Sequence, residues 1–339
     1  MAFDNIRIEK NMYNVPGKSF TQVLEELDPS ENYAGTQYEG LDAFQRQLKR
    51  FDIKVSGPNS DAVAKFYSTA DSSALFPEYV SRAVRSGITE SPLVKDIVAS
   101  TTYTDSLNYR SFAATTDLNP KTASAVAEGT ALPTVTISLK EKAVALKKYG
   151  RTIEASYEAM KFQRLDMFSL ALRQVGDFIA KQRFANAIDV IKNGDGNSNP
   201  AAVVTGASAT SVSYDDMLSL WSALGDFKMN TIIASPDMAL KLIKIYELQD
   251  RDIGIDFQYN GKFGTPFGAN FIKSDLVGEK TIIALDKRYA LEMVIASDVL
   301  VEYENSIVDQ MTKATVSSIS GFAKMYDGAS VVYKLKQTA

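Results

Sequence analysis

Hydrophobic residues in the first 70 positions recur at helical spacing in only one place. Between residues 41 and 51 every third or fourth position is apolar, which predicts one short amphipathic helix. The rest of this segment is polar and interrupted by prolines and glycines, which favour turns. Because one short helix cannot build a core of its own, we expect residues 1–70 to form an arm that lies on another surface or stays mobile.

Strand-like patterns follow from residue 91. The run SPLVKDIVAS (91–100) begins with a Ser-Pro turn or helix start, and the residues after it alternate toward a strand. Residues 112–133 are mostly small and polar, with too few large apolar side chains to anchor them to a core. Residues 134–139 alternate again, and a second strand-like run covers about 143–156. We predict a long two-stranded hairpin with a loose tip, which would rest on a neighbour because isolated hairpins are only marginally stable.

The longest helical pattern of the chain begins at Asp166 and ends near Lys192. Asp166 is a suitable N-cap, and apolar residues follow it on one stripe. At 1.5 Å per residue such a helix spans roughly 40 Å, which suits a structural spine. The run NGDGNSNP (193–200) ends it, because Asn193-Gly194 favours a left-handed cap and Pro200 forbids continuation.

Strand and helix patterns alternate in the second half of the chain. Ser213 with Asp216 forms a capping box for one helix, TIIA at 231–234 predicts a strand, and the Ser-Pro at 235 starts a further helix. This alternation is typical of a small α/β domain. Further strands are predicted at 281–285, 290–296, 298–303, about 306–318 and 329–336.

Composition removes several classes of function. The chain has 339 residues, 45% of them hydrophobic, and a net charge of -4, which does not favour broad electrostatic capture of nucleic acid or of an anionic membrane. Cysteine and histidine are absent, which excludes disulfides, thiolate or imidazole metal sites and every Ser-His mechanism. No apolar run approaches the roughly 20 residues that a membrane span requires, so we expect no membrane partner.

The run NGDGNSNP is where a metal or phosphate site would be sought. A calcium loop that starts at Asn193 has Ser198 where glycine is needed and Val204 where a bidentate glutamate is needed, and a frame from Asp195 fails at the same two positions. Neither a phosphate loop nor a dinucleotide fingerprint is complete. We therefore interpret the run as a turn, and predict no metal, no cofactor and no catalytic residue.

Two charged patterns leave alternatives open. Glu302 and Glu304 share one strand face and could form an acid/base pair, but the polar side of an amphipathic strand explains them more simply. A basic cluster at 140–151, opposed only by Glu141, is either a solvated face or a charged contact strip on a hairpin that reaches another subunit. The candidates for intersubunit contacts are Glu128, Lys140, Lys142, Lys147, Lys148 and Arg151.

The order of these segments resembles the major capsid proteins of tailed bacteriophages. The run AEGTALPTVTISLKEKAVALKKYGRTIEASYEAM (127–160) looks like the extended loop of that family returning to the body. The run FIAKQRFANAIDVIKNGDGNSNPAAVVTG (178–206) resembles its spine helix and the following turn, and SISGFAKMYDGASVVYKL (318–335) is similar to its final strands. The resemblance implies an α+β Hong Kong 97-like capsid fold.

The same resemblance implies a domain organisation. It consists of an N-terminal arm at 1–70, peripheral-domain parts at 71–103, 156–204 (with the spine helix) and 301–339, an extended loop at 104–155, and an axial domain at 205–300. The glycine-rich segment 261–268 would lie near the tip of the axial domain. The segment between Tyr109 and Arg151 is then expected to rest on another copy of the chain.

By resemblance the chain is a structural protein and not an enzyme. It would assemble into pentamers and hexamers of an icosahedral head that encloses double-stranded DNA without sequence preference, in the virion after assembly in the bacterial host cytoplasm. Scaffolding, portal and decoration proteins are further partners that the family implies. Some members form Lys–Asn crosslinks, and Lys140 or Lys142 lies in the corresponding loop, but ordinary surface lysines are the favoured interpretation.

Two other functions remain open. An encapsulin, a bacterial compartment of the same fold, would contain protein instead of DNA. A hydrolase that works with carboxylates and without histidine would be active as a monomer. The content of isolated particles separates the first alternative from a phage capsid, and the presence of particles separates the second.

Overall fold

The computed structural model divides into two compact units, each built from three stretches of the chain. Unit 1 comprises residues 1–91, 149–179 and 299–318, and unit 2 comprises residues 92–148, 180–298 and 319–339. The structure describes residues 4, 6–15, 18–114, 126, 128–129, 137–248, 266–306 and 308–336. Helix α6 (Leu165–Asn193) and strands β4 (Lys147–Ser156), β9 (Leu291–Ser306) and β10 (Met311–Lys324) contribute residues to both units.

Unit 1 is mainly helical. Its helices are α1 (Phe20–Leu27), α2 (Ala43–Arg50), α3 (Ala70–Ser73), α4 (Phe76–Glu90), α5 (Tyr157–Phe162) and the first half of α6. Short 3-10 turns lie before α1 (Lys10–Asn14), between α1 and α2 (Ser30–Tyr33) and between α2 and α3 (Val63–Tyr67). Capping boxes start α1 at Ser19 and α2 at Asp42, so both helix starts are encoded locally.

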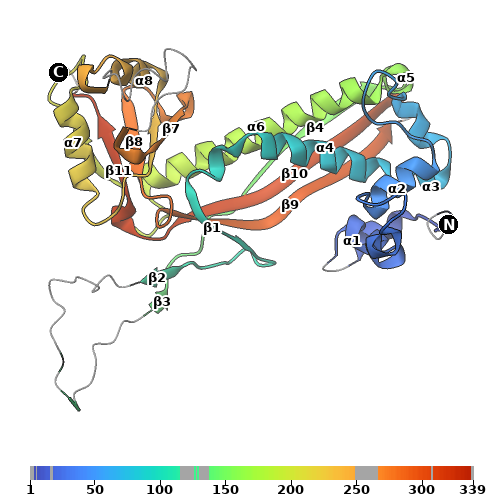
Figure 1. The fold of residues 1–339 in the computed structure, drawn as a ribbon, viewed down its shortest axis with the longest axis horizontal. Helices are drawn as coiled ribbons and strands as arrows, with labels where there is room; N and C mark the ends of the chain where they lie inside the picture. The colour runs from blue at the N-terminus through green and yellow to red at the C-terminus, as the bar shows by residue number, and fades with distance from the viewer. Residues whose placement is uncertain are drawn as a thin grey trace. The chain divides into compact units, whose positions relative to one another are not determined.

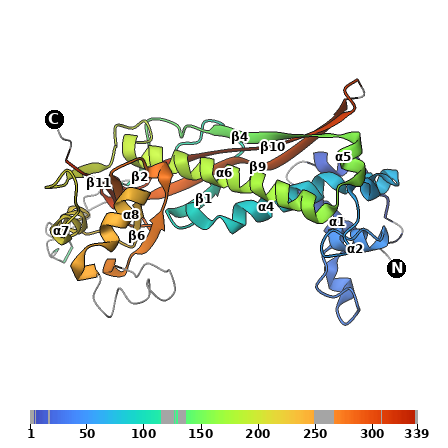
Figure 2. The ribbon, with the colours of Figure 1, turned by 90° about the horizontal axis from the view of Figure 1, so that it is seen from above.

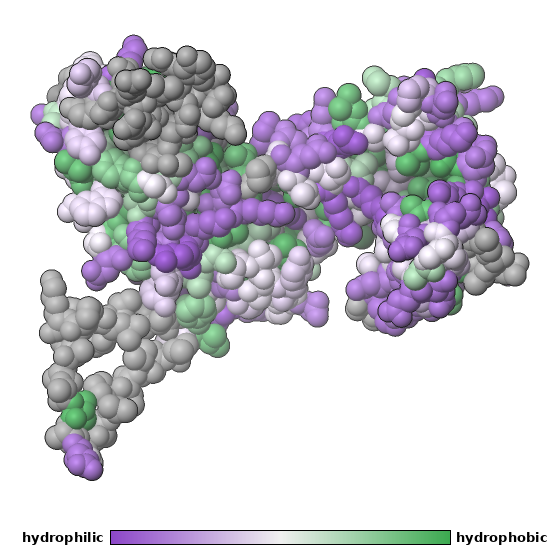
Figure 3. Space-filling model, in the orientation of Figure 1, coloured by the Kyte–Doolittle hydropathy of each residue, from purple (hydrophilic) through white to green (hydrophobic). Residues whose placement is uncertain are grey.

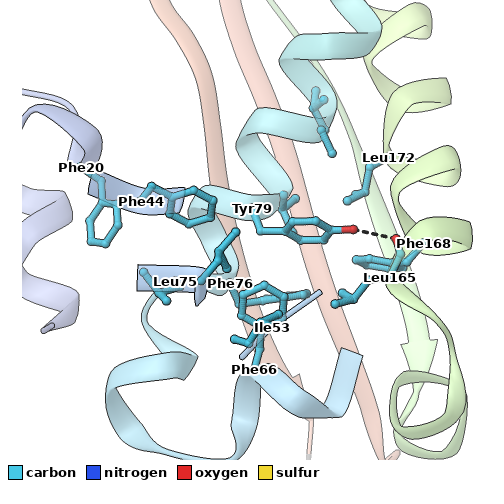
Figure 4. Packing of buried hydrophobic residues seen from close by; sticks show 14 of the residues in the cluster. Phe20, Phe44, Ile53, Phe66, Leu75, Phe76, Tyr79, Leu165, Phe168 and Leu172 are labelled. Carbon is cyan, nitrogen blue, oxygen red and sulfur yellow. Dashed lines mark hydrogen bonds between the residues drawn. The ribbon is translucent and has the colours of Figure 1, made fainter. Parts of the chain in front are cut away.

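An aromatic cluster forms the core of unit 1. Phe76 stacks on Phe168 with ring centroids 6.0 Å apart, and it meets Phe66 edge-on at 5.5 Å (Figure 4). The hydroxyl of the buried Tyr79 donates a hydrogen bond to the carbonyl oxygen of Leu165 (2.7 Å), which ties α4 to the start of α6. Rings from α4 and from the segment before it therefore pack on the first turns of the long helix.

Glycines allow α4 and α6 to approach closely. A Cβ atom on Gly176 would lie 2.1 Å from the carbonyl oxygen of Val84, and one on Gly87 would lie 2.1 Å from that of Arg173. Any side chain at either position would overlap the backbone of the facing helix. The two helices are thus held at a distance that only glycine permits.

The N-terminal 70 residues lie on this helical core. Phe20 and Leu24 of α1 and Phe44 and Leu48 of α2 are buried in the same cluster as the α4 and α6 side chains. Of the two arrangements expected for an arm, the described residues adopt the one in which it lies on another surface. The sequence predicted one helix here, whereas the structure has a second one, α1, which contributes the buried Phe20 and Leu24.

A five-stranded sheet organises unit 2. Its strand order is β5-β11-β8-β6-β7, where β11 pairs parallel with β5 and antiparallel with β8, and β6 pairs antiparallel with β8 and parallel with β7. The strands are β5 (Ala202–Thr205), β6 (Thr231–Ala234), β7 (Asn270–Lys273), β8 (Thr281–Leu285) and β11 (Ser330–Lys334). The central strands β6 and β8 are buried at every position, which explains why both read as continuous apolar runs.

Helices cover both faces of this sheet (Figure 2). Alternate residues such as Ile232, Ala284 and Tyr333 pack against α7 (Tyr214–Ala223) and α8 (Pro236–Ile243). The residues between them, such as Ile233 and Ile283, pack against the C-terminal half of α6. The predicted α/β alternation, the Ser213 capping box and the Ser-Pro helix start are confirmed.

A second sheet has the strand order β1-β9-β10-β4, with β1 (Val98–Tyr103) parallel to β9. The sequence analysis predicted two strands where β9 is one, because Ser297 and Asp298 interrupt its apolar pattern. Without a glycine or proline, two polar residues do not break a strand. Strand β10 continues through Gly321. Glycine is needed there for close approach of the backbone, because a Cβ would lie 2.5 Å from the carbonyl oxygen of Ala145. Within the described ranges, no helix is both long and apolar enough to cross a membrane.

Candidate assembly site at the base of the extended loop

The base of the predicted hairpin is present in unit 2. Strand β2 (Phe112–Ala114) pairs antiparallel with β3 (Ile137–Leu139), with Phe112 opposite Leu139 and Ala114 opposite Ile137 (Figure 1). The tip that the sequence analysis called loose lies in 115–136, of which only 126 and 128–129 are among the described residues. The second strand-like run, β4, is not part of this hairpin, because it pairs with β10.

A buried carboxylate holds the outgoing side of the loop. Glu292 on β9 is 3% exposed and accepts hydrogen bonds from Thr102 Oγ1 (2.6 Å), from the Tyr109 hydroxyl (2.7 Å) and from Ser111 Oγ. Burial, together with the hydrogen bond to Glu292, raises the pKa of Tyr109 above its usual range, so this phenol stays a donor. Three hydroxyls from the segment leading into β2 are thereby fixed to one carboxylate on the body of unit 2.

A buried ion pair holds the returning side. Lys140, the residue after β3, is 9% exposed, and its Nζ donates to Asp195 Oδ2 (2.8 Å) and to the carbonyl oxygen of Lys324. Burial alone would raise the pKa of Asp195, but the hydrogen bonds from Lys140 and Asn197 outweigh it, and the pKa is lowered. The same carboxylate accepts the backbone N–H of Lys324 (3.0 Å). The interpretation of Lys140 as an ordinary surface lysine is therefore wrong.

The turn NGDGNSNP supplies the carboxylate of this ion pair. Gly194 and Gly196 have φ of 88° and 94°, in the left-handed region expected for a turn that ends a helix. Asn199 closes the turn by accepting the backbone N–H of Asp195 at Oδ1 (3.1 Å). The turn interpretation is confirmed, and its acidic residue binds a lysine of the loop.

Lys324 completes the cluster beneath the loop. Its side chain is fully buried, and Nζ donates to the carbonyl oxygens of Asn199 (2.9 Å) and Asp327 (3.4 Å). Burial lowers the pKa of Lys324 to about 8. A pocket of about 570 Å³ opens beside the cluster and is lined by Leu139–Lys142, Gly196–Asn199, Phe227 and Met325–Gly328. The base of the loop therefore combines two buried anchors with an open pocket.

The other predicted contact residues do not share one environment. Lys142 is exposed, and its backbone N–H donates to Asn197 Oδ1 (3.0 Å). Lys147 lies 3.7 Å from Asp189 in a half-exposed ion pair, and Lys148 is exposed. In unit 1, the guanidinium of Arg151 lies over the ring of Phe178 at 3.9 Å. Glu128 is exposed in a turn with Gly129.

Sequence reasoning missed both Glu292 and Lys324. Each is a single charged residue inside an apolar strand run, LEMVIA and GFAKM respectively. Such a residue is rarely buried without partners, so the pattern carried a usable signal. The partners themselves, at positions 102, 109, 111 and 195, are distant in the sequence and could not be paired from it.

Comparison with known proteins identifies the family to which the chain belongs. Residues 140–328, more than half of the chain, match the family described as phage capsid protein. The chain belongs to this family, and its resemblance to the major capsid proteins of tailed bacteriophages is confirmed. No curated protein matches the chain.

Solved structures share the fold at low sequence identity. The capsid of a native GTA particle is 16% identical, with a TM-score of 0.54 over 73% of this chain and 91% of that one. A virus-like particle from Pyrococcus furiosus is 15% identical, with a TM-score of 0.52 over 76% and 99% of the two chains. The capsid of the cyanophage P-SCSP1u is 16% identical, with a TM-score of 0.52 over 72% and 88%. The predicted Hong Kong 97-like α+β fold is thus confirmed.

Proposed function

We propose that the chain is a shell subunit that assembles into pentamers and hexamers of an icosahedral phage head around double-stranded DNA. The observation that carries the proposal is the family match over residues 140–328, together with a hairpin whose two sides are each anchored to the body at the base. An anchored base holds β2 and β3, the two strands that precede and follow the tip, on the body of unit 2. A tip with few large side chains then adds contact area on a neighbouring copy.

Exposed apolar side chains near the hairpin base support self-association. Tyr103, Leu107 and Leu139 are each about 70% exposed, at 72%, 68% and 69%. Figure 3 shows hydrophobic areas among the hydrophilic ones on the face that it draws. A second copy of the chain would cover such side chains in a shell. Lys142 and Lys148 remain accessible for charged contacts at the same interface.

The domain assignment belongs to this proposal. Residues 1–70 act as the arm, 104–155 as the extended loop, 205–300 as the axial domain, and 71–103, 156–204 and 301–339 as the peripheral domain. Strands β6, β7 and β8 with helices α7 and α8 fall within the axial range, whereas β11 and most of β5, which belong to the same sheet, fall within the peripheral ranges. Scaffolding, portal and decoration proteins are further partners under this proposal, and assembly takes place in the host cytoplasm.

Electron microscopy of the purified full-length chain tests the proposal. Negative-stain images over a range of protein and salt concentrations are expected to show uniform shells or capsomer rings, because many weak interfaces act together. A monodisperse monomer under all of these conditions would contradict the proposal. It would favour the monomeric hydrolase instead.

A protein-filled compartment is the second candidate, and the shared fold of the Pyrococcus furiosus virus-like particle is the observation that favours it. An encapsulin shell would form the same rings and shells in the microscope. Particles isolated from the native source distinguish the two by their content. Nuclease-protected DNA supports the phage head, whereas a protein cargo without DNA supports the compartment.

A further inference from the structure

An open pocket of about 500 Å³ in unit 2 is lined mainly by lysines. Its lining consists of Lys192, Gly278–Thr281 and Lys334–Lys336. The β8–β11 pairing brings these segments together: Lys334 is opposite Thr281, and the backbone N–H of Leu335 donates to the carbonyl oxygen of Lys280 (3.3 Å). Helix α6 adds Lys192, whose Nζ donates to the carbonyl oxygen of Val277 (3.0 Å). Lysines from α6, from the turn before β8 and from the end of β11 therefore line one pocket.

The backbone around the pocket is constrained to present these lysines. Lys280 has a φ of 55°, which a non-glycine residue adopts only at some cost. The carboxylate of Asp237 holds this conformation by accepting the Lys280 backbone N–H (3.2 Å). Gly278 has a φ of 86°, in the left-handed region that favours glycine, and a Cβ there would be in van der Waals contact with Lys192 Nζ at 3.5 Å.

The residues that line the pocket do not neutralise its positive charge. Four lysines face one lining carboxylate, Glu279, and none of the four forms an ion pair with any residue that the structure describes. Elsewhere in the described structure some lysines do, such as Lys147 with Asp189 and Lys313 with Glu154. Like charges gathered without counter-charges repel one another, and a bound anion would relieve this repulsion.

The lining favours a phosphate chain over an acidic protein segment. Its one large apolar side chain, Leu335, is 3% exposed, so a peptide would find no apolar or aromatic anchor of the kind that protein interfaces need. Lysine ammonium groups act as point charges and require only phosphates at suitable spacing. Because no aromatic ring is among the lining residues that the structure describes, we expect no base stacking there and recognition that is independent of sequence.

We infer that this lysine pocket binds the phosphate backbone of double-stranded DNA and marks the face of the subunit that meets the packaged genome. The inference rests on the proposed shell function for its biological setting. The whole chain has a net charge of -4, so the surface outside the pocket would not hold DNA strongly. A few local contacts per copy, repeated over the shell, would then position the outer layer of DNA without immobilising it.

Fluorescence anisotropy with a short labelled DNA duplex of random sequence tests the inference. The triple variant Lys280→Gln, Lys334→Gln, Lys336→Gln is compared with the wild-type full-length chain between about 50 and 200 mM salt, where phosphate contacts dominate the salt dependence. Each lost phosphate contact lowers the slope of log K against log salt by about 1, so we expect the slope to fall by about 2 to 3. Circular dichroism checks that the variant is folded.

A matched control separates the pocket from net charge. The triple variant Lys54→Gln, Lys228→Gln, Lys244→Gln removes the same number of exposed, unpaired lysines from elsewhere in the described structure. It is expected to keep the wild-type slope. An equal loss in both variants, or no loss in the pocket variant, would overturn the inference. Displacement of DNA by poly-glutamate or by inorganic phosphate at equal charge concentration would also overturn it, in favour of an acidic segment or a small anion.

Failure of the shell function remains distinguishable from failure of the pocket. The anisotropy measurement uses unassembled chain, and particle formation is scored separately by electron microscopy. If neither wild type nor variants form particles while the slope still falls in the pocket variant, the DNA site stands and the shell proposal fails. If wild type and both variants form particles, and the salt slope of the pocket variant equals that of wild type, the shell proposal stands and the DNA site fails.

Discussion

Single charged residues in buried positions decide how the N-terminal segment and the loop base are held. The Arg46 side chain is fully buried, and its Nε donates to the equally buried Asp28 at 2.6 Å, while the guanidinium lies 4.3 Å from the Tyr33 ring centroid. Lys140, Asp195 and Lys324 form the corresponding cluster beneath the loop. In both places a charge is tolerated inside the protein because its partners surround it.

Removal of one member of the Arg46 pair is expected to be costly. Arg46→Met leaves the Asp28 carboxylate buried without a cation, which destabilises folded proteins by about 3 to 5 kcal/mol. Urea unfolding of the variant measures this difference. The exposed Lys54→Met is the control and should change the free energy of unfolding by less than about 0.5 kcal/mol. Equal effects in the two variants would show that the Arg46 pair is not structural.

The buried Lys324 predicts a pH dependence at alkaline pH. Its pKa is about 8 in the folded chain and 10.5 in the unfolded one, so the unfolded state binds more protons between these values. The free energy of unfolding should therefore rise from pH 8 to 10.5, by roughly 3 kcal/mol from this group, whereas below pH 8 the cost of burying the cation is fully present. Urea titrations of wild type and Lys324→Met at pH 7, 8, 9 and 10 isolate this contribution. Parallel pH profiles would refute it.

Among the elements, the crossing of α4 and α6 depends on glycine. Alanine is about 1 kcal/mol better than glycine within a helix, so propensity alone predicts that Gly176→Ala stabilises the chain. Because the new Cβ would lie 2.1 Å from the Val84 carbonyl oxygen, we expect instead a loss of about 1 to 3 kcal/mol as the helices separate. Thermal or urea unfolding measures it, with Gln174→Ala on the exposed side of the same helix as control. A stabilised Gly176→Ala would show that the helices part without cost.

At the level of the whole molecule, the loop is expected to serve assembly and not folding. Strands β2 and β3 pair on either side of residues 115–136, so a short Gly-Ser linker in place of these residues should keep the base with its anchors at Glu292 and Lys140. The shortened chain should unfold at nearly the wild-type urea concentration but yield few or no particles in sedimentation and electron microscopy. Normal particle yield would mean that the loop does not make the intersubunit contacts proposed for it.

Local patterns were sufficient for much of the fold. Continuous apolar runs predicted β6 and β8, Ser213 with Asp216 predicted the start of α7, and Gly194 predicted the end of α6. Each depends on neighbours within a few residues, such as a cap, a turn or a periodicity. The order of these elements was also sufficient to indicate the family that residues 140–328 match.

Long-range pairing accounts for what these patterns could not supply. A lysine at 140 has the same local signature whether it lies in solvent or beside Asp195, and β4 alternates in the same way whether it pairs with the hairpin or with β10. The free energy of burying a charge or adding a strand depends on groups that come together only when distant segments fold. Periodicity and caps therefore defined the elements of this capsid subunit, whereas the anchors of its loop and its lysine pocket arise from contacts between them.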